Sequence, residues 1–180
     1  MIPVVTTARL RLRPHTPDDI DAATAMWADR TVTRFTGGRA FTREESWARL
    51  LRYTGTWDWF GYGFWAVEEI ESGSYVGQLG LGEFARDTVP PLPLVPEVGW
   101  SFVAAAHGRG FASEGVRAAL AWADANVAAD RTMCLIDPAN TASIRVAQRC
   151  GFAAVDPVVY KTTPSLRFER MRGASAASAG

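Results

Sequence analysis

Two glycines, Gly108 and Gly110, lie in a turn that joins an expected strand to an expected helix. Residues 98–102 alternate large apolar with small side chains, which is typical of a half-buried strand, and helical spacing of apolar residues begins at Val116. A glycine backbone approaches a ligand closely and adopts positive φ, and a helix N-terminus offers unpaired N–H groups. The turn therefore predicts a site for an anion such as a pyrophosphate.

Two nucleotide-binding motifs do not fit this turn. The sequence has no Gly-x-x-x-x-Gly-Lys-Ser/Thr, and Gly108, Gly110 and Gly115 lack the spacing of a Rossmann fingerprint. The segment His107-Gly-Arg-Gly-Phe-Ala112 instead resembles the acyl-CoA loop of the GNAT acetyltransferases, Gln/Arg-x-x-Gly-x-Gly/Ala. The departure is His107, where the family usually has Gln or Arg.

A second segment strengthens this resemblance. Residues 140–152 are similar to the Asn-x-x-Ser…Gly-Phe element that follows the fifth strand in GNAT enzymes. Asn140 alone also suits a helix N-cap, and Gly151 a helix stop. The two motifs follow one another in the family order, so the resemblance covers about residues 7–172. The opening at residues 9–14 is closest to the branch that includes ribosomal-protein N-terminal acetyltransferases.

The resemblance implies transfer of an acetyl group from acetyl-CoA, as co-substrate, to a primary amine. An alkyl ammonium has a pKa of about 10, so it must lose a proton before it attacks the thioester. In the family the fourth and fifth strands splay apart and the pantetheine arm inserts between them, and the fourth strand here is residues 97–103. No metal is implied.

The resemblance also supplies candidate site residues. The CoA-binding residues, which act mainly through their backbone, are Phe102, Val103, Ala104, His107, Gly108, Arg109, Gly110, Phe111, Ala112 and Asn140. Glu97 is our candidate base, acting through water; the alternative is a solvated strand-edge carboxylate, and Glu83 is the second choice. Ser143 is the candidate acid for the leaving thiolate, or else a helix-surface serine. The tyrosine used as acid in many members is absent from residues 140–150.

Composition fits one globular domain, which we assign to residues 1–172, followed by a tail at 173–180 that we expect to be disordered. The 180 residues are 48% hydrophobic, and 19 Lys plus Arg balance 19 Asp plus Glu, so no global charge favours nucleic acid. We expect no membrane partner and a cytoplasmic location, because no apolar run approaches the roughly 20 residues of a membrane span. A homodimer remains an open alternative.

The two cysteines are too few for a disulfide framework, and no Cys/His cluster has the spacing of zinc ligands. Cys134 lies in an apolar run, so we expect it to be a buried structural thiol.

Periodicity and capping signals give the elements that position these residues. We expect strands at 8–13, 64–67, 75–81, 97–103, 131–136, 152–155 and 166–171, and helices at 16–29, 42–53, about 116–127 and 140–150. The order β-α-α-β-β-β-α-β-α-β-β predicts an α/β, GNAT-like single domain, with a mixed sheet of about seven strands flanked by about four helices.

The acceptor has to be inferred from two segments beside the expected site. Residues 57–65 hold six aromatic residues in nine positions, which we interpret as part core and part exposed wall of a pocket. Residues 31–41 form either an acceptor-binding loop or a plain connector. Asp58 is the only acid in the two segments, which favours a peptide N-terminus or a small apolar amine over polyamines and aminoglycosides. The alternative for the whole chain is a non-catalytic GNAT-fold module that binds acyl-CoA or another protein.

Overall fold

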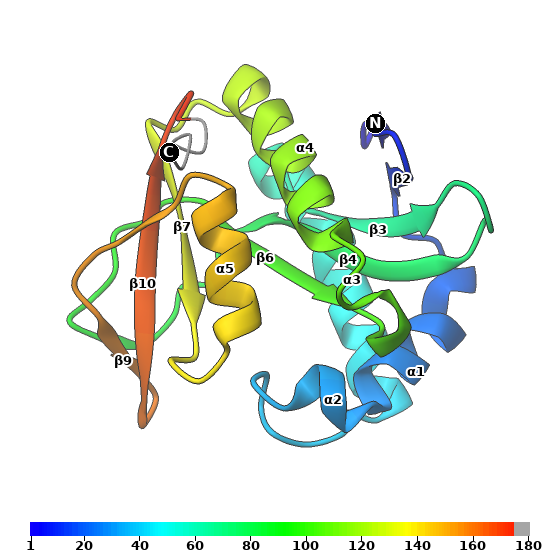
Figure 1. The fold of residues 1–180 in the computed structure, drawn as a ribbon, viewed down its shortest axis with the longest axis horizontal. Helices are drawn as coiled ribbons and strands as arrows, with labels where there is room; N and C mark the ends of the chain where they lie inside the picture. Colours follow the sequence, from blue (N-terminus) through cyan, green and yellow to red (C-terminus); the bar gives the residue numbers. More distant parts are fainter. Residues whose placement is uncertain (175–180) are drawn as a thin grey trace.

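The computed structural model describes residues 1–174, whose ten strands form one mixed sheet (Figure 1). The strands are β1 (Val5–Thr6), β2 (Leu10–Arg13), β3 (Phe64–Glu69), β4 (Tyr75–Gly82), β5 (Thr88–Val89), β6 (Glu97–Phe102), β7 (Arg131–Ile136), β8 (Ala153–Ala154), β9 (Val158–Tyr160) and β10 (Thr163–Met171). Their order across the sheet is β1-β2-β3-β4-β6-β7-β10-β9-β5, and β8 pairs with β10. The α/β mixed sheet predicted from sequence is confirmed.

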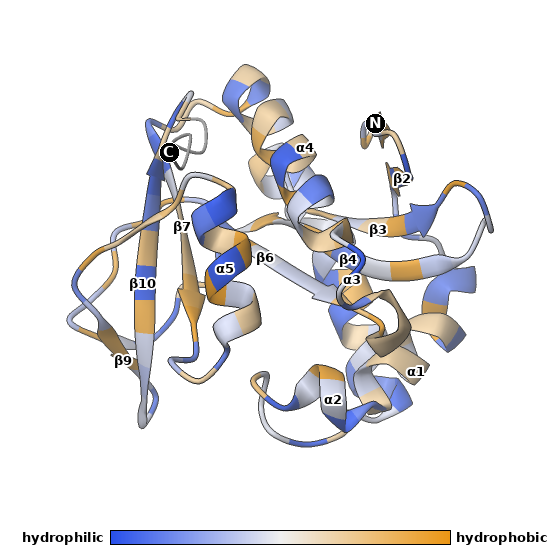
Figure 2. Ribbon diagram, viewed as in Figure 1, coloured by the Kyte–Doolittle hydropathy of each residue, from blue (hydrophilic) through white to orange (hydrophobic). Residues whose placement is uncertain are grey.

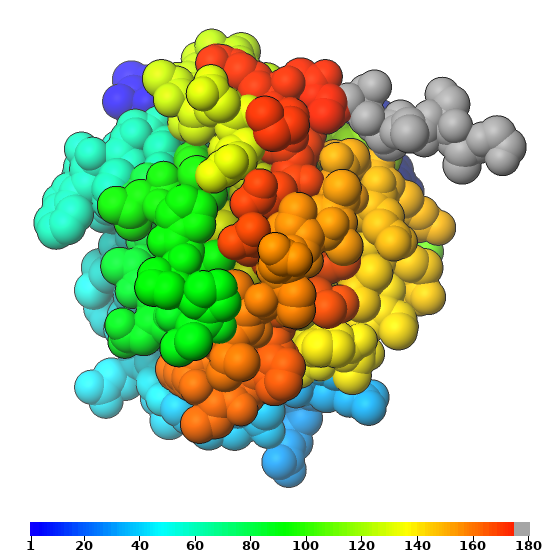
Figure 3. All heavy atoms as spheres, turned by 90° about the vertical axis from the view of Figure 1, so that its left-hand side faces the viewer, coloured from blue at the N-terminus to red at the C-terminus, as the bar shows by residue number. Residues whose placement is uncertain are grey.

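The strand count is higher than the sequence suggested. All seven expected strands are present, and the three additional ones, β1, β5 and β9, have only two or three residues each. Segments this short hold too few residues to show an alternating pattern. β5 lies within the proline-rich loop between β4 and β6, residues 83–96, which holds four prolines, and pairs with β9 at the edge of the sheet. In Figure 3 the green loop that contains β5 lies beside the orange segment that contains β9.

The expected helices are also present, with two boundaries corrected: the helix expected from about 116 begins at Phe111, and the one expected to end near Tyr53 is longer. They are α1 (Ile20–Ala28), α3 (Arg43–Phe60), α4 (Phe111–Asn126) and α5 (Thr141–Arg149), together with a short α2 (Arg30–Thr33) and the 3₁₀ turns η1 (Pro17–Asp19) and η2 (Ala104–Ala106). The expected capping box at Thr42 and Glu45 begins α3. The predicted end near Tyr53 was wrong, because α3 continues until Gly61 takes the left-handed conformation at φ 74°.

Helices pack on both faces of the sheet (Figure 1). On one face α4 packs so closely against β4 that a Cβ at Gly115 would lie 2.5 Å from the Leu79 side chain. On the other face α3 packs with Tyr53 stacked on Phe64, with 4.3 Å between ring centroids. Figure 2 shows the hydrophobic colouring of β7 beside α5, and Met133, Cys134 and Ile136 of β7 are buried.

Most of the aromatic segment belongs to the core. Trp57, Tyr62, Phe64 and Trp65 are buried, whereas Trp59 is 85% exposed. The segment is therefore part core and part exposed, as expected, whereas its role as the wall of a pocket stays a prediction. Cys134 is buried as expected, and burial raises the pKa of its thiol.

Within residues 1–174, no helix is long and apolar enough to cross a membrane, and no cluster of three His, Cys, Asp or Glu could hold a metal ion. Residues 175–180, the greater part of the expected tail, lie outside the described residues.

Candidate active site

The candidate site begins where two parallel strands separate. β6 and β7 are paired only at Glu97 and Met133, where the Met133 N–H donates to the Pro96 carbonyl at 3.0 Å. Beyond this point β6 continues in register with β4 alone, and Figure 1 shows it diverging from β7. The β7-facing edge of residues 98–102 is thus left without a strand partner in the described chain. An extended ligand with amide groups fits such an edge, because it would pair with these backbone groups.

The glycine turn follows directly at the end of β6. The Val103 N–H donates to the Val76 carbonyl at 3.0 Å, and His107 Nε2 lies 3.0 Å from the Phe102 carbonyl oxygen. These contacts fix the strand end before Gly108 and Gly110, which have φ of 76° and 80°. Only glycine adopts this conformation readily, so both positions have a backbone reason for their residue type.

The backbone of this turn offers a row of free donors. The first hydrogen bond of α4 runs from the Glu114 N–H to the Gly110 carbonyl at 3.1 Å. Within residues 1–174, no N–H from Gly108 to Ser113 donates a hydrogen bond. A Cβ placed on Gly108 would meet nothing within 4 Å, so the space beside the turn is open. These features fit the pyrophosphate of CoA, with the positive end of α4 directed at it.

Two arginines flank the same turn. Arg9 donates to the Arg109 carbonyl at 2.9 Å, and the guanidinium groups of Arg9 and Arg109 lie 4.8 and 4.3 Å from the centre of the Phe111 ring. Their side chains are about half exposed. Both guanidinium groups stand beside the free N–H groups, although Arg9 pairs with Glu114 and Arg109 with Glu69.

Glu97, the candidate base, is held by an arginine that sequence reasoning missed. Arg86 donates to both carboxylate oxygens of Glu97 at 2.7 Å. Glu97 is only 5% exposed, so the alternative of a solvated strand-edge carboxylate was wrong. Any water or amine that gives a proton to Glu97 must compete with this guanidinium.

Glu83, the second candidate, has a more open carboxylate. Its Oε1 accepts a hydrogen bond from the Tyr62 hydroxyl at 2.6 Å. Burial and this bond together raise the pKa of Tyr62, which therefore keeps its proton. The other carboxylate oxygen of Glu83 makes no hydrogen bond within residues 1–174, so it is free to accept one.

Asn140 and Ser143 lie at the start of α5, which follows the end of β7. The Asn140 side-chain oxygen accepts from the Ser143 N–H at 3.1 Å, so Asn140 is the N-cap of α5. Ser143 is partly exposed, and its hydroxyl makes no hydrogen bond in the described chain. α4 begins after the end of β6, so the two helix starts follow the diverging ends of the two strands (Figure 1).

Neither histidine lies where a catalytic base is needed. His15 lies in the interior with its side chain 2% exposed, stacked on Tyr53, and neither ring nitrogen has a hydrogen-bond partner within residues 1–174. Burial lowers the pKa of His15 to about 4, so the ring is neutral near pH 7. The ring of His107 contacts the backbone carbonyl of Phe102 at the end of β6.

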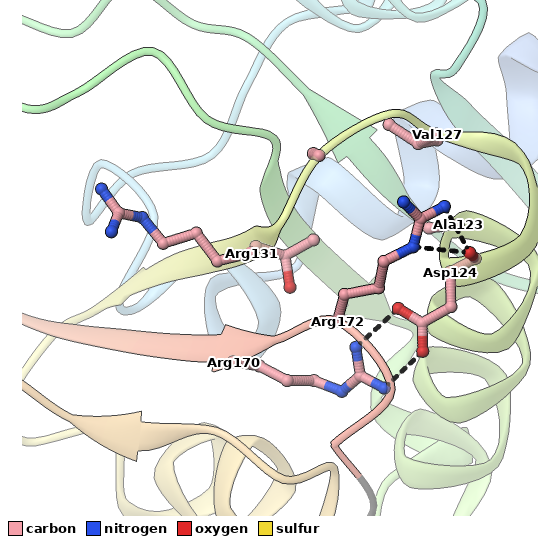
Figure 4. A pocket seen from close by; sticks show the side chains of 8 residues that line it. Ala123, Asp124, Val127, Arg131, Arg170 and Arg172 are labelled. Atoms are coloured by element: carbon pink, nitrogen blue, oxygen red, sulfur yellow. Dashed lines mark hydrogen bonds and ion pairs between the residues drawn. The ribbon is translucent and has the colours of Figure 1, made fainter.

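A separate hollow lies at the other end of β7, between α4 and β10 (Figure 4). Here Arg170 donates to both carboxylate oxygens of Asp124 at 2.9 and 2.7 Å, and Arg172 donates to the Asp124 backbone carbonyl. Hydrogen bonds from Arg170 lower the pKa of Asp124. These contacts fasten the C-terminal strand to α4, so we assign this cluster a structural role.

Comparison with known proteins identifies the family. A family model for the acetyltransferase (GNAT) domain matches residues 9–153. The chain belongs to the GNAT acetyltransferase family. A curated relative of this GNAT chain is the uncharacterised protein YkkB of Bacillus subtilis (strain 168), which is 30% identical over 113 residues. That alignment covers 62% of the chain and 62% of YkkB, so the chain spans less than two thirds of this relative.

Solved structures show the same GNAT fold. A Bordetella pertussis protein assigned to the GNAT acetyltransferases is 31% identical, with a TM-score of 0.82 over 94% of this chain and 99% of that one. RimL, a ribosomal L7/L12 α-N-protein acetyltransferase in complex with coenzyme A, is 13% identical, with a TM-score of 0.75 over 94% and 98%. Spermidine N-acetyltransferase of Vibrio cholerae, in complex with CoA and spermine, is 12% identical, with a TM-score of 0.72 over 93% and 98%. The last two likenesses establish the fold alone.

Sequence reasoning assigned no site role to three residues that lie at or near the site. Arg86 and Tyr160 come from a proline-rich loop and a three-residue strand, and the Arg86 guanidinium lies 4.8 Å from the centre of the Tyr160 ring. No sequence pattern connects either residue to Glu97. Arg9 carried a weak signal, because it belongs to the alternating arginines that open the chain.

Proposed function

We propose that this protein is an N-acetyltransferase that moves an acetyl group from acetyl-CoA to a primary amine by direct attack on the thioester. One observation carries the proposal: the row of free N–H groups from Gly108 to Ser113 stands at the end of a strand that has left its parallel neighbour. The first feature suits a pyrophosphate and the second an extended amide chain. CoA contains both.

The proposed CoA residues act mainly through their backbone. Residues 98–104 would pair with the pantetheine amides, and the turn from His107 to Ala112 would hold the pyrophosphate, aided by the Arg9 and Arg109 guanidinium groups. Asn140 would border the pantetheine arm from the other side of the opening. Bound acetyl-CoA supplies the acetyl group as a thioester.

The chain's own residues would supply the proton transfers. Glu97 or Glu83 would take one proton of the ammonium through water before attack, and Ser143 would relay to the leaving thiolate the second proton that the nitrogen loses after attack. The open carboxylate oxygen of Glu83 favours it, whereas both oxygens of Glu97 already accept hydrogen bonds from Arg86. Holding amine and thioester in one cleft contributes the remaining acceleration.

The proposed acceptor is a peptide α-amine or a small amine with an apolar body. Support comes from the scarcity of acids, since Asp58 is the only one in residues 57–65 and 31–41, and from the half-buried Phe84 ring, which adjoins the buried Phe64 on the α3 face of the sheet. Apolar rings of this kind exclude water from a reacting thioester.

Two measurements test the proposal. Acetyl-CoA at 100 times its Kd should add about 2.7 kcal/mol to the free energy of unfolding, visible as a rise in Tm. Release of free thiol should then be followed over N-terminal peptides, amino acids, polyamines and aminoglycosides. A Tm shift without turnover would support a CoA-binding module instead, and the absence of any shift with acyl-CoAs would leave only a protein-interaction role.

A further inference from the structure

Residues 30–52 lie on the α3 face of the sheet, where we place the acceptor, and they carry a local excess of positive charge. Residues 30–52 contain six arginines and two glutamates, although the whole chain has a formal net charge of zero. Two of the arginines are neutralised, because Arg39 pairs with Glu45 and Arg43 with Asp21. Within residues 1–174 the remaining four, Arg30, Arg34, Arg49 and Arg52, form no ion pair.

Three of these four arginines lie over aromatic rings: Arg34 over the neighbouring Phe35 alone, at 5.1 Å, and Arg49 and Arg52 over two rings each. The Arg49 guanidinium lies 4.4 Å from the centre of the Trp27 ring and 4.5 Å from that of Phe41, and it donates to the Tyr53 hydroxyl at 3.4 Å. The Arg52 guanidinium lies 5.5 Å from the Tyr53 ring and 5.6 Å from the Phe84 ring. Contacts with ring faces leave most guanidinium N–H donors free.

The same rings connect Arg52 to the candidate base. The centre of the Phe84 ring lies 5.6 Å from the Arg52 guanidinium and 4.8 Å from the Arg86 guanidinium, and Arg86 binds Glu97. Phe64, which contacts both Tyr53 and Phe84, would be 2.9 Å from a Cβ on Gly99 of β6. Arg49 and Arg52 therefore lie over the face of the sheet that presents Glu97 and Gly99.

Unpaired guanidinium groups at this place select the charge of the acceptor. They repel a polycation such as spermidine, and they bind a carboxylate through two parallel N–H donors. Resting on the proposed acetyltransferase function, we propose that the acceptor carries a carboxylate as well as its amine, and that Arg49 and Arg52 bind that carboxylate. The carboxylate belongs either to a free α-amino acid or to an acidic residue of an N-terminal peptide.

This proposal is tested with pairs of acceptors whose two members differ only in the presence of a carboxylate. Phenylalanine is compared with phenethylamine, and the C-terminally amidated peptide Ser-Glu-Phe with Ser-Gln-Phe, by thiol release with saturating acetyl-CoA. We expect kcat/KM to be at least about tenfold higher for the carboxylate member of one pair, since a hydrogen bond to a charged group contributes this much or more. The pair that responds identifies the source of the carboxylate.

Variants connect the preference to the two arginines. Arg49→Gln and Arg52→Gln should each lower kcat/KM about tenfold or more for the carboxylate member, with the other member and the Kd of acetyl-CoA unchanged. Arg30→Gln is the matched control, because Arg30 is exposed and unpaired but has no ring contact within residues 1–174. Arg52 is exposed, so the Arg52→Gln protein should fold. It therefore tests the proposal even if substitution of the half-buried Arg49 unfolds the protein.

The outcomes separate this proposal from the function on which it rests. Equal rates within both pairs, fastest turnover of spermidine, or an equal loss for both members in the variants would overturn it while leaving the acetyltransferase intact. Without turnover of any acceptor, the acetyltransferase proposal fails, and calorimetry with N-acetylphenylalanine and N-acetylphenethylamine in the presence of CoA then decides. Equal affinity for these two compounds would overturn carboxylate recognition, whereas a preference lost in Arg52→Gln would support it.

Discussion

At the scale of single residues, backbone conformation and charge pairing explain the site better than side-chain type does. Gly108 and Gly110 are required because their φ angles are positive, and their backbone N–H groups remain free for a ligand. Among the acids, Glu97 is bound by Arg86 on both oxygens, whereas Glu83 is bound on one. Each difference leads to a substitution whose effect can be measured.

Gly110→Val should weaken CoA binding at least tenfold, or about 1.4 kcal/mol. At φ 80° a β-branched residue is strained, so the turn must change shape and misdirect its N–H groups. Calorimetric titration with acetyl-CoA measures the loss. Gly61→Val, at φ 74° with open space around it, imposes similar strain away from the turn and should leave the affinity unchanged. Unchanged affinity in a folded Gly110→Val protein would show that the turn does not bind CoA.

Removing the true base should lower kcat by about 10²–10⁴ with little change in KM for acetyl-CoA. Glu97→Gln and Glu83→Gln are compared in steady-state assays between pH 6 and 9, and Ser143→Ala should lower kcat less than the base variant does. Glu71→Gln, in the exposed β3–β4 turn, is the control. Full rate in Glu97→Gln across this range would assign the base elsewhere, with Glu83 tested first.

At the scale of elements, α1 and α3 cover a polar interior as well as aromatic rings. Gln78 of β4 is 1% exposed and donates to the Tyr53 hydroxyl at 3.0 Å. His15 packs against Tyr53, and both of its ring nitrogens lack a partner in the described chain. Buried polar groups without partners reduce stability. The stability of the fold should therefore depend on the protonation of His15, the titratable group of this layer that lacks a partner within residues 1–174.

The stability of the protein should fall as the pH drops from about 6.5 to 4, because of His15. The pKa of His15 is lowered by burial from 6.5 in the unfolded chain to about 4 in the folded one, so only the unfolded state binds a proton in this window. The contribution is full above about pH 6.5, and about 3 kcal/mol is lost by pH 4. Urea unfolding at several pH values measures this slope.

His15→Phe should flatten that slope, since a phenyl ring retains the stacking on Tyr53 without titrating. His107→Gln, which removes the other, exposed histidine, should retain the slope. An unchanged slope in His15→Phe would place the titrating group elsewhere.

At the scale of the whole molecule, the first strands are fastened to α4 through Glu114. Its carboxylate accepts hydrogen bonds from the Thr7 hydroxyl at 2.6 Å, the Arg9 N–H at 3.0 Å and the Arg9 Nε at 2.7 Å. Burial acts to raise the pKa of Glu114, but these hydrogen bonds outweigh burial and lower it. Because Arg9 also holds the Arg109 carbonyl, the same joint steadies the proposed CoA turn.

Glu114→Gln should lower the free energy of unfolding at pH 7 by about 1–3 kcal/mol and weaken acetyl-CoA binding. A carboxylate with a lowered folded pKa stabilises the protein above its unfolded pKa of 4.5, and this stability is lost as the pH falls through the folded value. The difference from the parent protein should therefore shrink below about pH 4.5. Urea unfolding against pH measures it. A constant difference at all pH values would indicate lost packing instead of lost charge.

The sequence alone determined the local elements and the family. Alternation, helical spacing and capping residues act within a few positions, so they predicted seven of the ten strands, the four main helices and the glycine turn. The short strands β1, β5 and β9 and the last two turns of α3 were missed, because too few residues carry their pattern or because aromatic residues fit a helix as well as a strand.

Only the tertiary structure decided which side chains meet. The partners of Glu97, Glu83 and Glu114 lie 11, 21 and 105 or more residues away along the chain. The separation of β6 from β7 and the gathering of Arg49 and Arg52 over the acceptor face depend on sheet order and helix packing. Such contacts depend on how the elements pack against one another, and local spacing in the sequence does not predict that packing.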